Sequence, residues 1–368
     1  MFDTVYYLAE LSLPSKSAYT IHVIQMCNAI SKNQKDVNLL IPNQDIKYEE
    51  IKEEYGIKFD FKIFPIFKKM KILNFISRII YAIKCYNKIK KKKTNYLVIS
   101  RSVIASIFLA IFQVKNFLEI HHELKGFSKI FFQLTKFYFI EKNVKYILIN
   151  SYLLNFFNLK KDKYFILDDA VNIDLFNQSF ETKVIPKTCG YFGSLTKGKG
   201  IELIIEIAKK LPEIDFHIYG DLSISAFKDL DLKNHKNIIF FDHLKYSKIP
   251  STMNKYEILL MPYLNKVFVR SKNLEVSKYM SPLKLFEYLA ASKIIIASRL
   301  DVYSHILVDN YNCLLSSSDK ISEWVLNISN IFSDLKKYEY IRNGAKETAI
   351  KNTWDKRVKI IFASKFYN

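Results

Sequence analysis

The stretch CGYFGSLTKGKGIELIIEIAKKL, residues 189–211, joins a short apolar run to a helix-forming segment through a glycine-rich loop. The run Cys189–Gly193 is expected to be a buried strand, and apolar residues at helical spacing predict a helix over Gly200–Leu211. Half of the eight glycines of the chain lie in these residues: Gly190, Gly193, Gly198 and Gly200. In a chain so poor in glycine, this clustering indicates a backbone that turns tightly or approaches a ligand closely.

The loop also has the charge of an anion site. Lys197 and Lys199 lie beside the expected helix start at Gly200, where exposed N–H groups and the positive end of the helix dipole attract anions. The glycine spacing is neither that of the dinucleotide fingerprint nor that of a Walker loop. The alternative is an ordinary loop between a strand and a helix.

Outward from this unit, short apolar runs alternate with helical segments along the whole chain, as in parallel sheets with crossover helices. Strands are expected at Thr4–Leu8, Val37–Ile41, Phe59–Phe64, Tyr96–Ser100, Phe117–Ile120, Tyr146–Asn150, Cys189–Gly193, Phe216–Gly220, Asn237–Phe241, Ile258–Met261 and Ile294–Ala297. Helices are expected between them, for example at Ala18–Ser31, Gly200–Leu211, Pro282–Ala291 and Ile321–Ile331. The pattern predicts an α/β protein with two doubly wound units, and Tyr164–Lys187, which has no clear period, is expected to link them.

Length and composition agree with two folded domains. The chain has 368 residues, with 49% hydrophobic and 25% charged residues, which excludes a disordered chain, a collagen-like chain and a coiled coil. The most apolar uncharged run, at 102–114, is shorter than the roughly 20 residues that span a bilayer, and the N-terminus lacks the pattern of a secretory signal. Four scattered cysteines indicate neither a disulfide framework nor a zinc site. We therefore expect a cytoplasmic protein without a membrane-spanning helix.

The net charge of +20 is concentrated in one segment. Residues 61–118 contain eleven lysines and two arginines but no acidic residue. Within them, Ile72, Phe75, Ile76, Ile79 and Ile83 recur at helical spacing, and Lys84, Lys88 and Lys90–Lys93 close the stretch, which predicts an amphipathic basic helix. Such a helix binds an anionic membrane surface or packs its apolar stripe on its own domain, and both readings stay open. A nucleic acid partner is not expected, since no reader motif is present and only six of the 56 basic residues are arginine.

A second feature is SPLKLFEYLAASKIIIAS, residues 281–298. Pro282 suits the first turn of a helix and Ser281 its cap, so the amides of Leu283 and Lys284 are expected to point into a cleft. Glu287 follows one turn later among apolar neighbours and needs a hydrogen-bonding partner. The hydroxyls of a ligand are one candidate, and a salt bridge to a nearby lysine is the alternative.

A third feature is FLEIHHELKG, residues 117–126, where an expected strand ends in His121 and His122. Ligands of doubly wound sheets bind at the carboxyl ends of strands, so both histidines have a functional position. A structural role is the alternative. Metal binding is not indicated, because no third ligand follows at a sequence spacing typical of metal sites.

With these features, the chain resembles the glycosyltransferases of the GT-B fold, in the large retaining family 4. The resemblance rests on AYTIHVIQMCNAI at 18–30, EIHHE at 119–123, NSYLL at 150–154, LDDAVNIDLFN at 167–177, YFGSLTKGKGIELIIEIAKKLP at 191–212, FHIYGD at 216–221, residues 281–298 and TWDKR at 353–357. It implies two Rossmann-like domains facing a central cleft: 1–170 for the acceptor, 171–350 for the nucleotide sugar, and a helix at 351–368 that returns to the first domain.

The resemblance also implies the roles of individual residues. Lys199 would hold the donor diphosphate. Glu287 stands in the place of the second glutamate of the family's E-x7-E motif and would hold the ribose hydroxyls. His121 would lie beside the donor sugar. The remaining donor-binding positions are Gly193, Ser194, Lys197 and the segment Pro282, Leu283, Lys284 and Leu285. Two positions depart from the family: Tyr279 stands where the first glutamate is usual, and Ser194 where many members have a basic partner to Lys199.

The implied function is retaining transfer of a sugar from a nucleotide-sugar donor to a glycan or lipid-linked acceptor in surface polysaccharide biosynthesis. Neither a metal nor another cofactor is expected in that chemistry. The expected location is the cytoplasm, with residues 61–93 as a peripheral contact to the inner face of the membrane. The two departures leave two alternatives: a catalytically inactive nucleotide-sugar-binding scaffold subunit, and an epimerase-type GT-B enzyme that needs no acceptor.

Overall fold

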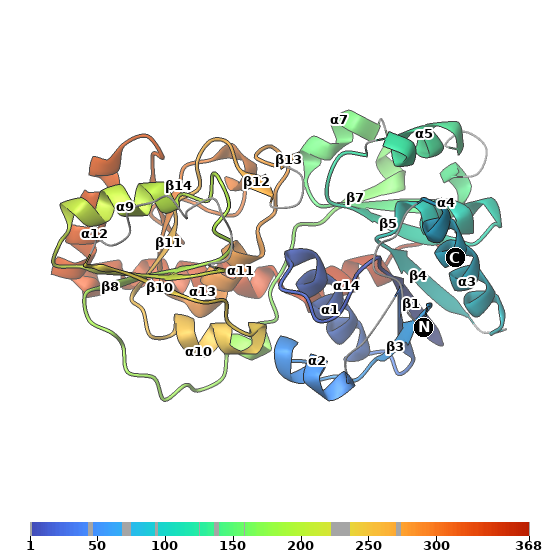
Figure 1. Cartoon of the computed structure of the whole chain (residues 1–368), viewed down its shortest axis with the longest axis horizontal. Coiled ribbons are helices and arrows are strands. Elements are labelled where there is room, and N and C mark those ends of the chain that lie inside the picture. Colours follow the sequence, from blue (N-terminus) through green and yellow to red (C-terminus); the bar gives the residue numbers. More distant parts are fainter. Residues whose placement is uncertain are drawn as a thin grey trace. The chain divides into compact units, whose positions relative to one another are not determined.

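The structure is a computed structural model that describes residues 2–42, 47–67, 75–92, 95–124, 126–135, 140–157, 159–221, 236–269 and 274–367. The chain forms two compact units (Figure 1). Residues 1–169 and 354–368 form the first unit, and residues 170–353 form the second. The chain thus leaves the first unit once and returns to it with its last helix.

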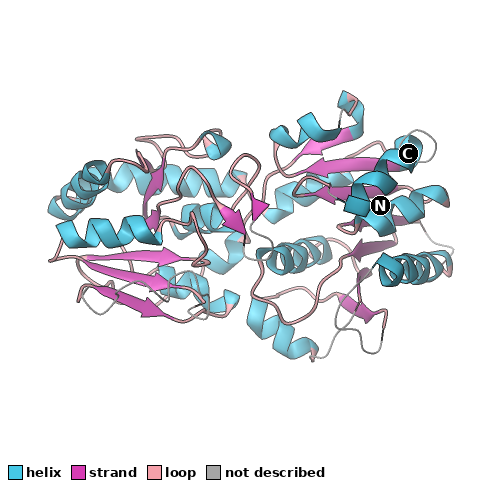
Figure 2. Ribbon diagram, turned by 45° about the horizontal axis from the view of Figure 1, so that its top comes forward, coloured by secondary structure: helices cyan, strands magenta, loops and turns pink. Residues whose placement is uncertain are grey.

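The first unit is built on a parallel sheet of seven strands in the order β3-β2-β1-β4-β5-β6-β7. The strands are β1 Thr4–Leu8, β2 Val37–Ile41, β3 Lys62–Pro65, β4 Tyr96–Ser100, β5 Asn116–Ile120, β6 Val144–Leu148 and β7 Tyr164–Ile166. The helices are α1 Ala18–Ser31, α2 Tyr48–Tyr55, α3 Phe75–Lys90, α4 Val103–Ile111, α5 Gly126–Thr135, α6 Glu141–Asn143, α7 Leu154–Phe157 and α14 Trp354–Phe362. Figure 2 shows the strands lying between helices, which explains why β1, β2 and β5 are buried along their whole length.

The second unit contains a parallel sheet of six strands in the order β10-β9-β8-β11-β14-β15. The strands are β8 Thr188–Phe192, β9 Asp215–Tyr219, β10 Ile238–Phe241, β11 Ile258–Met261, β14 Ile294–Ser298 and β15 Leu314–Ser316, with a separate antiparallel pair of β12 Phe268–Val269 and β13 Leu274–Glu275. The helices are α8 Ile173–Phe176, α9 Ile201–Lys210, α10 Ile249–Met253, α11 Leu283–Ala291, α12 Ile321–Ser333 and α13 Glu339–Lys351. One apolar cluster joins α9, α12 and the inner strands and contains the buried Trp324.

The predicted α/β class with two parallel sheets is confirmed, and each expected strand is present within a few residues of its expected bounds. The expected linker is wrong in part. Its first residues form β7, which pairs with β6 at the edge of the first sheet, and its residues 173–176 form α8. A strand of three residues is too short to show a period of two.

The basic helix predicted over residues 72–93 is α3, and it packs through a different face from the expected stripe. Its buried side chains include Tyr81, Ala82, Cys85 and Ile89. On the opposite face Phe75, Ile76, Ile80 and Ile83 are exposed, with Ile76 at 67%. Ile72 and Lys93 of the prediction lie outside the described residues. The apolar stripe therefore does not belong to the core of the first unit. Among the described residues, no helix has the length and hydropathy needed to cross a bilayer.

Candidate functional site

The glycine-rich loop of the second unit follows β8 and lies directly on the chain after β11. Gly198 and Gly200 have φ of +82° and +81°, and a Cβ added to Gly200 would lie 1.7 Å from the carbonyl oxygen of Pro262. The Leu264 amide donates a hydrogen bond to the Gly198 carbonyl oxygen at 3.0 Å. These two glycines are therefore required for backbone packing inside the protein, whatever the loop binds.

The helix α11 begins one residue later than expected. Its N-cap is Pro282, which offers no side-chain hydrogen bond, so the prediction that Ser281 caps the helix is wrong. The reason is that Pro282 has an extended backbone, with ψ of 123°, and therefore precedes the first turn instead of belonging to it. Without a side-chain cap from this position, the first amides of the helix are available to another acceptor.

The structure brings together Lys199, Lys284 and Glu287 of the predicted site. Lys284 and Glu287 lie on the first turns of α11 and are 8% and 5% exposed. The Lys284 Nζ is 3.7 Å from the ring centre of Tyr191 and 5.2 Å from that of Tyr263, while the Lys199 Nζ is 4.2 Å from the Tyr263 ring. Two ammonium groups therefore share one aromatic ring, beside a buried carboxylate.

The electrostatics of this cluster follow from burial. Loss of hydration lowers the pKa of Lys199 to about 8. Burial, together with repulsion from Lys199, holds the pKa of Lys284 well below its usual range, although attraction by Glu287 acts in the opposite direction. Both lysines are therefore poorly hydrated as ammonium groups, and an anion that supplies hydrogen-bond acceptors would favour their protonated forms.

Gly193 completes the cluster, since a Cβ at this position would lie 2.4 Å from the Lys284 Nζ. Ser194 and Lys197 are exposed at the rim of the loop: the Ser194 carbonyl oxygen accepts a hydrogen bond from the Tyr191 hydroxyl at 2.9 Å, and the Lys197 Nζ lies 5.7 Å from the Phe268 ring centre. The other predicted positions lie on α11 or beside it, with Leu283 and Leu285 buried.

Tyr279, which departs from the family motif, is buried and held by the chain. Its side chain is 4% exposed, and its hydroxyl donates a hydrogen bond to the Glu275 carbonyl oxygen at 3.1 Å. This position therefore has a packing role in the structure.

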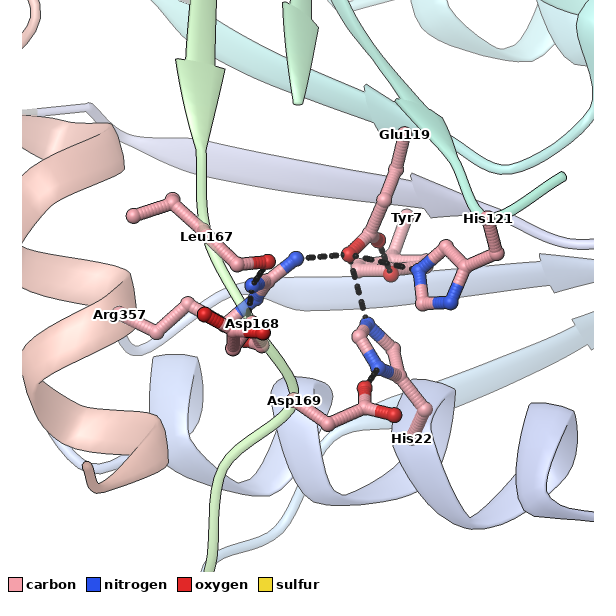
Figure 3. Close-up of polar contacts among 8 residues, drawn as sticks. All are labelled: Tyr7, His22, Glu119, His121, Leu167, Asp168, Asp169 and Arg357. Carbon is pink, nitrogen blue, oxygen red and sulfur yellow. Dashed lines mark hydrogen bonds and ion pairs between the residues drawn. The ribbon is translucent and has the colours of Figure 1, made fainter. Parts of the chain in front are cut away.

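A second group of buried polar side chains lies in the first unit, around Glu119 on β5 (Figure 3). Its Oε1 is 2.7 Å from the His22 Nε2 and accepts a hydrogen bond from Arg357 of α14, and its Oε2 accepts one from the Tyr7 hydroxyl at 2.5 Å. Asp169 lies 2.5 Å from the other ring nitrogen of His22. This Glu119 network joins β1, α1, β5 and α14 in the interior of the first unit.

His121 lies at the edge of the Glu119 network, directly after β5. Its Nε2 is 3.4 Å from the Glu119 Oε1, its side chain is 17% exposed, and its ring lies edge-on to that of His22 at 4.8 Å between centres. Burial and the nearby Arg101 lower the pKa of His121 to about 3, so the ring is neutral at neutral pH. His122 points elsewhere: its Nδ1 lies 2.9 Å from the Glu123 carbonyl oxygen in an exposed position.

The charge of Glu119 is compensated by its neighbours. Burial alone would raise the pKa of this carboxyl group, but the charges of His22 and Arg357 outweigh burial and hold the pKa well below its usual range. His22, Glu119 and His121 have ligand atoms within 4.8 Å of one another, which is close enough for a metal ion. The residues do not fit one well, because the Oε1 of the shared carboxylate already accepts from the Arg357 guanidinium, whose charge repels a dication.

Sequence reasoning missed the roles of Glu119, His22 and Arg357. The signal at Glu119 was a carboxylate inside the strand NFLEI, since a charge in a buried strand needs a partner. Arg357 ends the TWDKR motif, but nothing in the sequence pairs it with Glu119, which is 238 residues away along the chain. Arg357 donates to Glu119 and to the Leu167 and Asp168 carbonyl oxygens.

Comparison with known proteins gives a match for the second unit. Residues 174–348 match the sequence model of the family described as glycosyl transferases group 1. An uncharacterized glycosyltransferase of Methanocaldococcus jannaschii is 22% identical over 170 residues, which is 46% of this chain and 44% of that protein. The chain therefore spans less than half the length of this curated relative.

Solved structures match the fold of nearly the whole chain. A glycosyltransferase of Rickettsia africae superposes with a TM-score of 0.73 at 16% identity, covering 99% of both chains. HepE of Anabaena, in complex with UDP and glucose, has a TM-score of 0.70 at 12% identity over 99% of this chain and 100% of its own. WaaG, described as a glycosyltransferase involved in lipopolysaccharide biosynthesis, has a TM-score of 0.65 at 12% identity over 98% and 100%. The family match thus covers the second unit, and the whole chain shares the GT-B fold of these glycosyltransferase structures.

Proposed function

We propose that the protein is a retaining glycosyltransferase that moves a sugar from a nucleotide-sugar donor to a glycan or lipid-linked acceptor in surface polysaccharide biosynthesis. The observation that carries the proposal is the cluster of Lys199, Lys284 and Glu287 at the start of α11. It supplies two cations for phosphates and a buried carboxylate for hydroxyl groups within one unit. The relative HepE, whose structure contains UDP and glucose, supports a donor of this class.

In this proposal the second unit binds the donor. Lys199 and the first amides of α11 hold the diphosphate, and Glu287 accepts hydrogen bonds from the ribose hydroxyls. As the bond between the sugar and the diphosphate breaks, negative charge grows on the leaving phosphate, and fixed positive groups stabilise it more than the bound ground state. Since the lysines supply this charge, the proposal includes no metal.

The first unit supplies the acceptor side and His121. A neutral imidazole is the form that donates one hydrogen bond from an N–H and accepts another, and the low pKa of His121 keeps it in that form at neutral pH. We assign His121 to a contact with the donor sugar, held in place by the Glu119 network.

We also propose that the protein works in the cytoplasm and contacts the inner face of the membrane through residues 61–93. The exposed apolar face of α3 lies on the most basic segment of the chain, and this pairing suits an anionic bilayer surface better than solvent. The role of WaaG in lipopolysaccharide biosynthesis supports an acceptor made at a membrane.

The decisive experiment is thermal stabilisation by a panel of nucleoside diphosphates, on the wild type and on Glu287→Ala. A ligand at 100 times its dissociation constant adds about 2.7 kcal/mol to the free energy of unfolding. We expect one nucleotide to stabilise the wild type and the variant to lose most of that gain. No shift with any nucleotide at millimolar concentration would contradict the proposal.

The inactive scaffold remains the second candidate, because Tyr279 has a packing role where the family motif has a glutamate. Such a subunit binds nucleotide without hydrolysis or transfer, so sugar transfer to any acceptor would exclude it. An epimerase-type enzyme would release nucleotide from the donor alone, at a rate indifferent to added acceptor.

A further inference from the structure

The side chain of Lys284 ends in a buried amino group. It is 8% exposed, and its Nζ has no hydrogen-bond partner among the described residues. The contacts that the structure gives this Nζ are the faces of the Tyr191 and Tyr263 rings. A buried ammonium group needs hydrogen-bond acceptors to offset its lost hydration. The faces of aromatic rings compensate for only part of the lost hydration free energy.

Helix packing does not account for a lysine here. The residues next to it in sequence on α11 are the buried Leu283, Leu285 and Phe286. Glu287, one helical turn later, attracts the Lys284 ammonium group, but this attraction does not hold the pKa of Lys284 at its usual value. A charged group kept in such a place indicates a negatively charged ligand that arrives from outside.

The position of the ammonium group suggests what it replaces. It lies against Gly193, where a Cβ would be 2.4 Å from the Nζ, and Gly193 directly precedes Ser194. The family resemblance implies a basic partner to Lys199 at the position of Ser194. Lys284 therefore brings a second amino group from α11 to the residue that precedes position 194.

We propose that the Lys284 side chain is the second cation of a diphosphate site, acting with Lys199 in place of the basic group that Ser194 lacks. The inference rests on the proposed function for its ligand, the diphosphate of a nucleotide sugar. The same chemistry is offered by the diphosphate of a lipid carrier, and the experiment below separates the two sources.

The charge state of the site supports this reading. In the unliganded protein, burial and repulsion from Lys199 favour the neutral amine of Lys284. A diphosphate supplies the oxygens that this ammonium lacks and favours the protonated form. Binding is therefore expected to take up a proton, and calorimetry in buffers of different ionisation enthalpy measures that uptake.

The test is Lys284→Met, which keeps an unbranched side chain one atom shorter and removes the amino group. We expect the Kd of the nucleoside diphosphate to rise about 10–100-fold, as for a lost charge-assisted hydrogen bond, and proton uptake to fall. The Tm of the unliganded variant is expected to stay equal or to rise, because the substitution removes a buried amino group for which the described residues supply no hydrogen-bond acceptor. A merely structural lysine would show the opposite: a lower Tm and an unchanged Kd.

The matched control is Lys293→Met. Lys293 is also 8% exposed and follows the other end of the same helix, and its loss is expected to leave nucleotide affinity unchanged. A rescue variant adds a sharper test: Ser194→Lys in the Lys284→Met background is expected to restore part of the affinity. If Lys284→Met does not fold, Lys284→Gln serves in its place.

The probes are UDP, GDP, ADP and CDP, inorganic pyrophosphate and geranyl diphosphate. An unchanged Kd for Lys284→Met with a nucleotide that binds the wild type would overturn the inference and leave the proposed function standing. If pyrophosphate or geranyl diphosphate binds in a Lys284-dependent way but no nucleotide binds, the result supports a diphosphate site made by Lys199 and Lys284 and contradicts the nucleotide-sugar function. Binding of none of the probes would reject both.

Discussion

At the scale of single residues, loss of hydration determines the chemistry of the candidate site. Lys199 is a lysine whose pKa burial lowers to about 8, far below the usual 10.4. It titrates within the range of ordinary assays, so its contribution to binding an anion is measurable by changing the pH alone.

Nucleotide affinity is predicted to depend on pH through Lys199. Below pH 8 its ammonium form is present before binding, whereas above pH 8 binding must first take up a proton. The Kd of the nucleoside diphosphate should therefore rise as the pH increases above 8, by up to about tenfold per pH unit. Titration calorimetry between pH 7 and pH 9.5 measures this slope.

Lys199→Arg is the control for that prediction, because arginine stays charged over the whole range. It should bind the nucleotide with a shallower pH dependence, and Lys199→Ala should weaken binding by about 1.5–3 kcal/mol at pH 7. Equal affinity of Lys199→Ala and the wild type would remove this residue from the site.

The glycine loop makes a prediction about stability. Gly200→Ala places a Cβ 1.7 Å from the Pro262 carbonyl oxygen at φ of +81°, so we expect it to lower the free energy of unfolding by at least about 2 kcal/mol. Gly126→Ala is the matched control: its φ is +56° and its added Cβ would meet nothing within 4 Å. It should cost only about 1 kcal/mol, and urea denaturation compares the two.

At the scale of elements, α3 shows how a periodic pattern is ambiguous. Apolar residues at helical spacing predicted the helix correctly, but the buried face carries Tyr81, Ala82 and Cys85, and the isoleucines Ile76, Ile80 and Ile83 are exposed. Periodicity detects an apolar stripe, whereas the residues that surround the helix decide which stripe is covered.

Vesicle binding tests the exposed face of α3. The double variant Lys90→Gln and Lys91→Gln should weaken binding to anionic vesicles by about 2 kcal/mol, since each lysine near such a surface contributes about 1 kcal/mol. Ile76→Ser with Ile80→Ser should weaken it as well. The control is Lys336→Gln with Lys337→Gln, which removes two exposed lysines from the second unit. Sedimentation that is the same for all variants would contradict the membrane proposal.

At the scale of the whole molecule, the last helix, α14, returns to the first unit. Residues 354–368 belong to the first unit although they follow the whole of the second. Arg357 is 3% exposed and donates to Glu119, and the Tyr367 hydroxyl donates to the Lys115 carbonyl oxygen at 2.7 Å. The fold of the first unit therefore needs the end of the chain.

Arg357→Met is predicted to destabilise the first unit by about 3–5 kcal/mol at pH 7, because it takes one of two charged partners from the buried Glu119 and leaves only His22. Adding Glu119→Gln should recover part of the loss, and the exposed Lys359→Gln should have little effect. Since the low pKa of Glu119 contributes stability above its unfolded value of about 4.3, the penalty should shrink as the pH falls through the folded pKa. Urea denaturation at pH 7 and over a series of pH values below 4 measures both effects.

The order of strands and helices was predictable from the sequence, because buried parallel strands are continuous apolar runs and amphipathic helices repeat every 3.6 residues. The glycine loop, Lys199 and Glu287 were also predictable, since rare glycines, helix starts and isolated charges are local signals. Short edge strands such as β7 and β15 were not, because three residues show no period.

What only the tertiary structure decided is which distant groups meet. The sequence alone determined that Lys284 begins a helix beside Glu287, but only the packing of α11 against β8 shows its ammonium group at Gly193, between two tyrosine rings. In the same way Glu119 was visible as a charge in a strand, whereas its partner Arg357 was not. The physical reason is that residues from distant parts of the chain decide which side chains lose their hydration and which charges become neighbours. No local sequence pattern encodes this burial or this charge pairing.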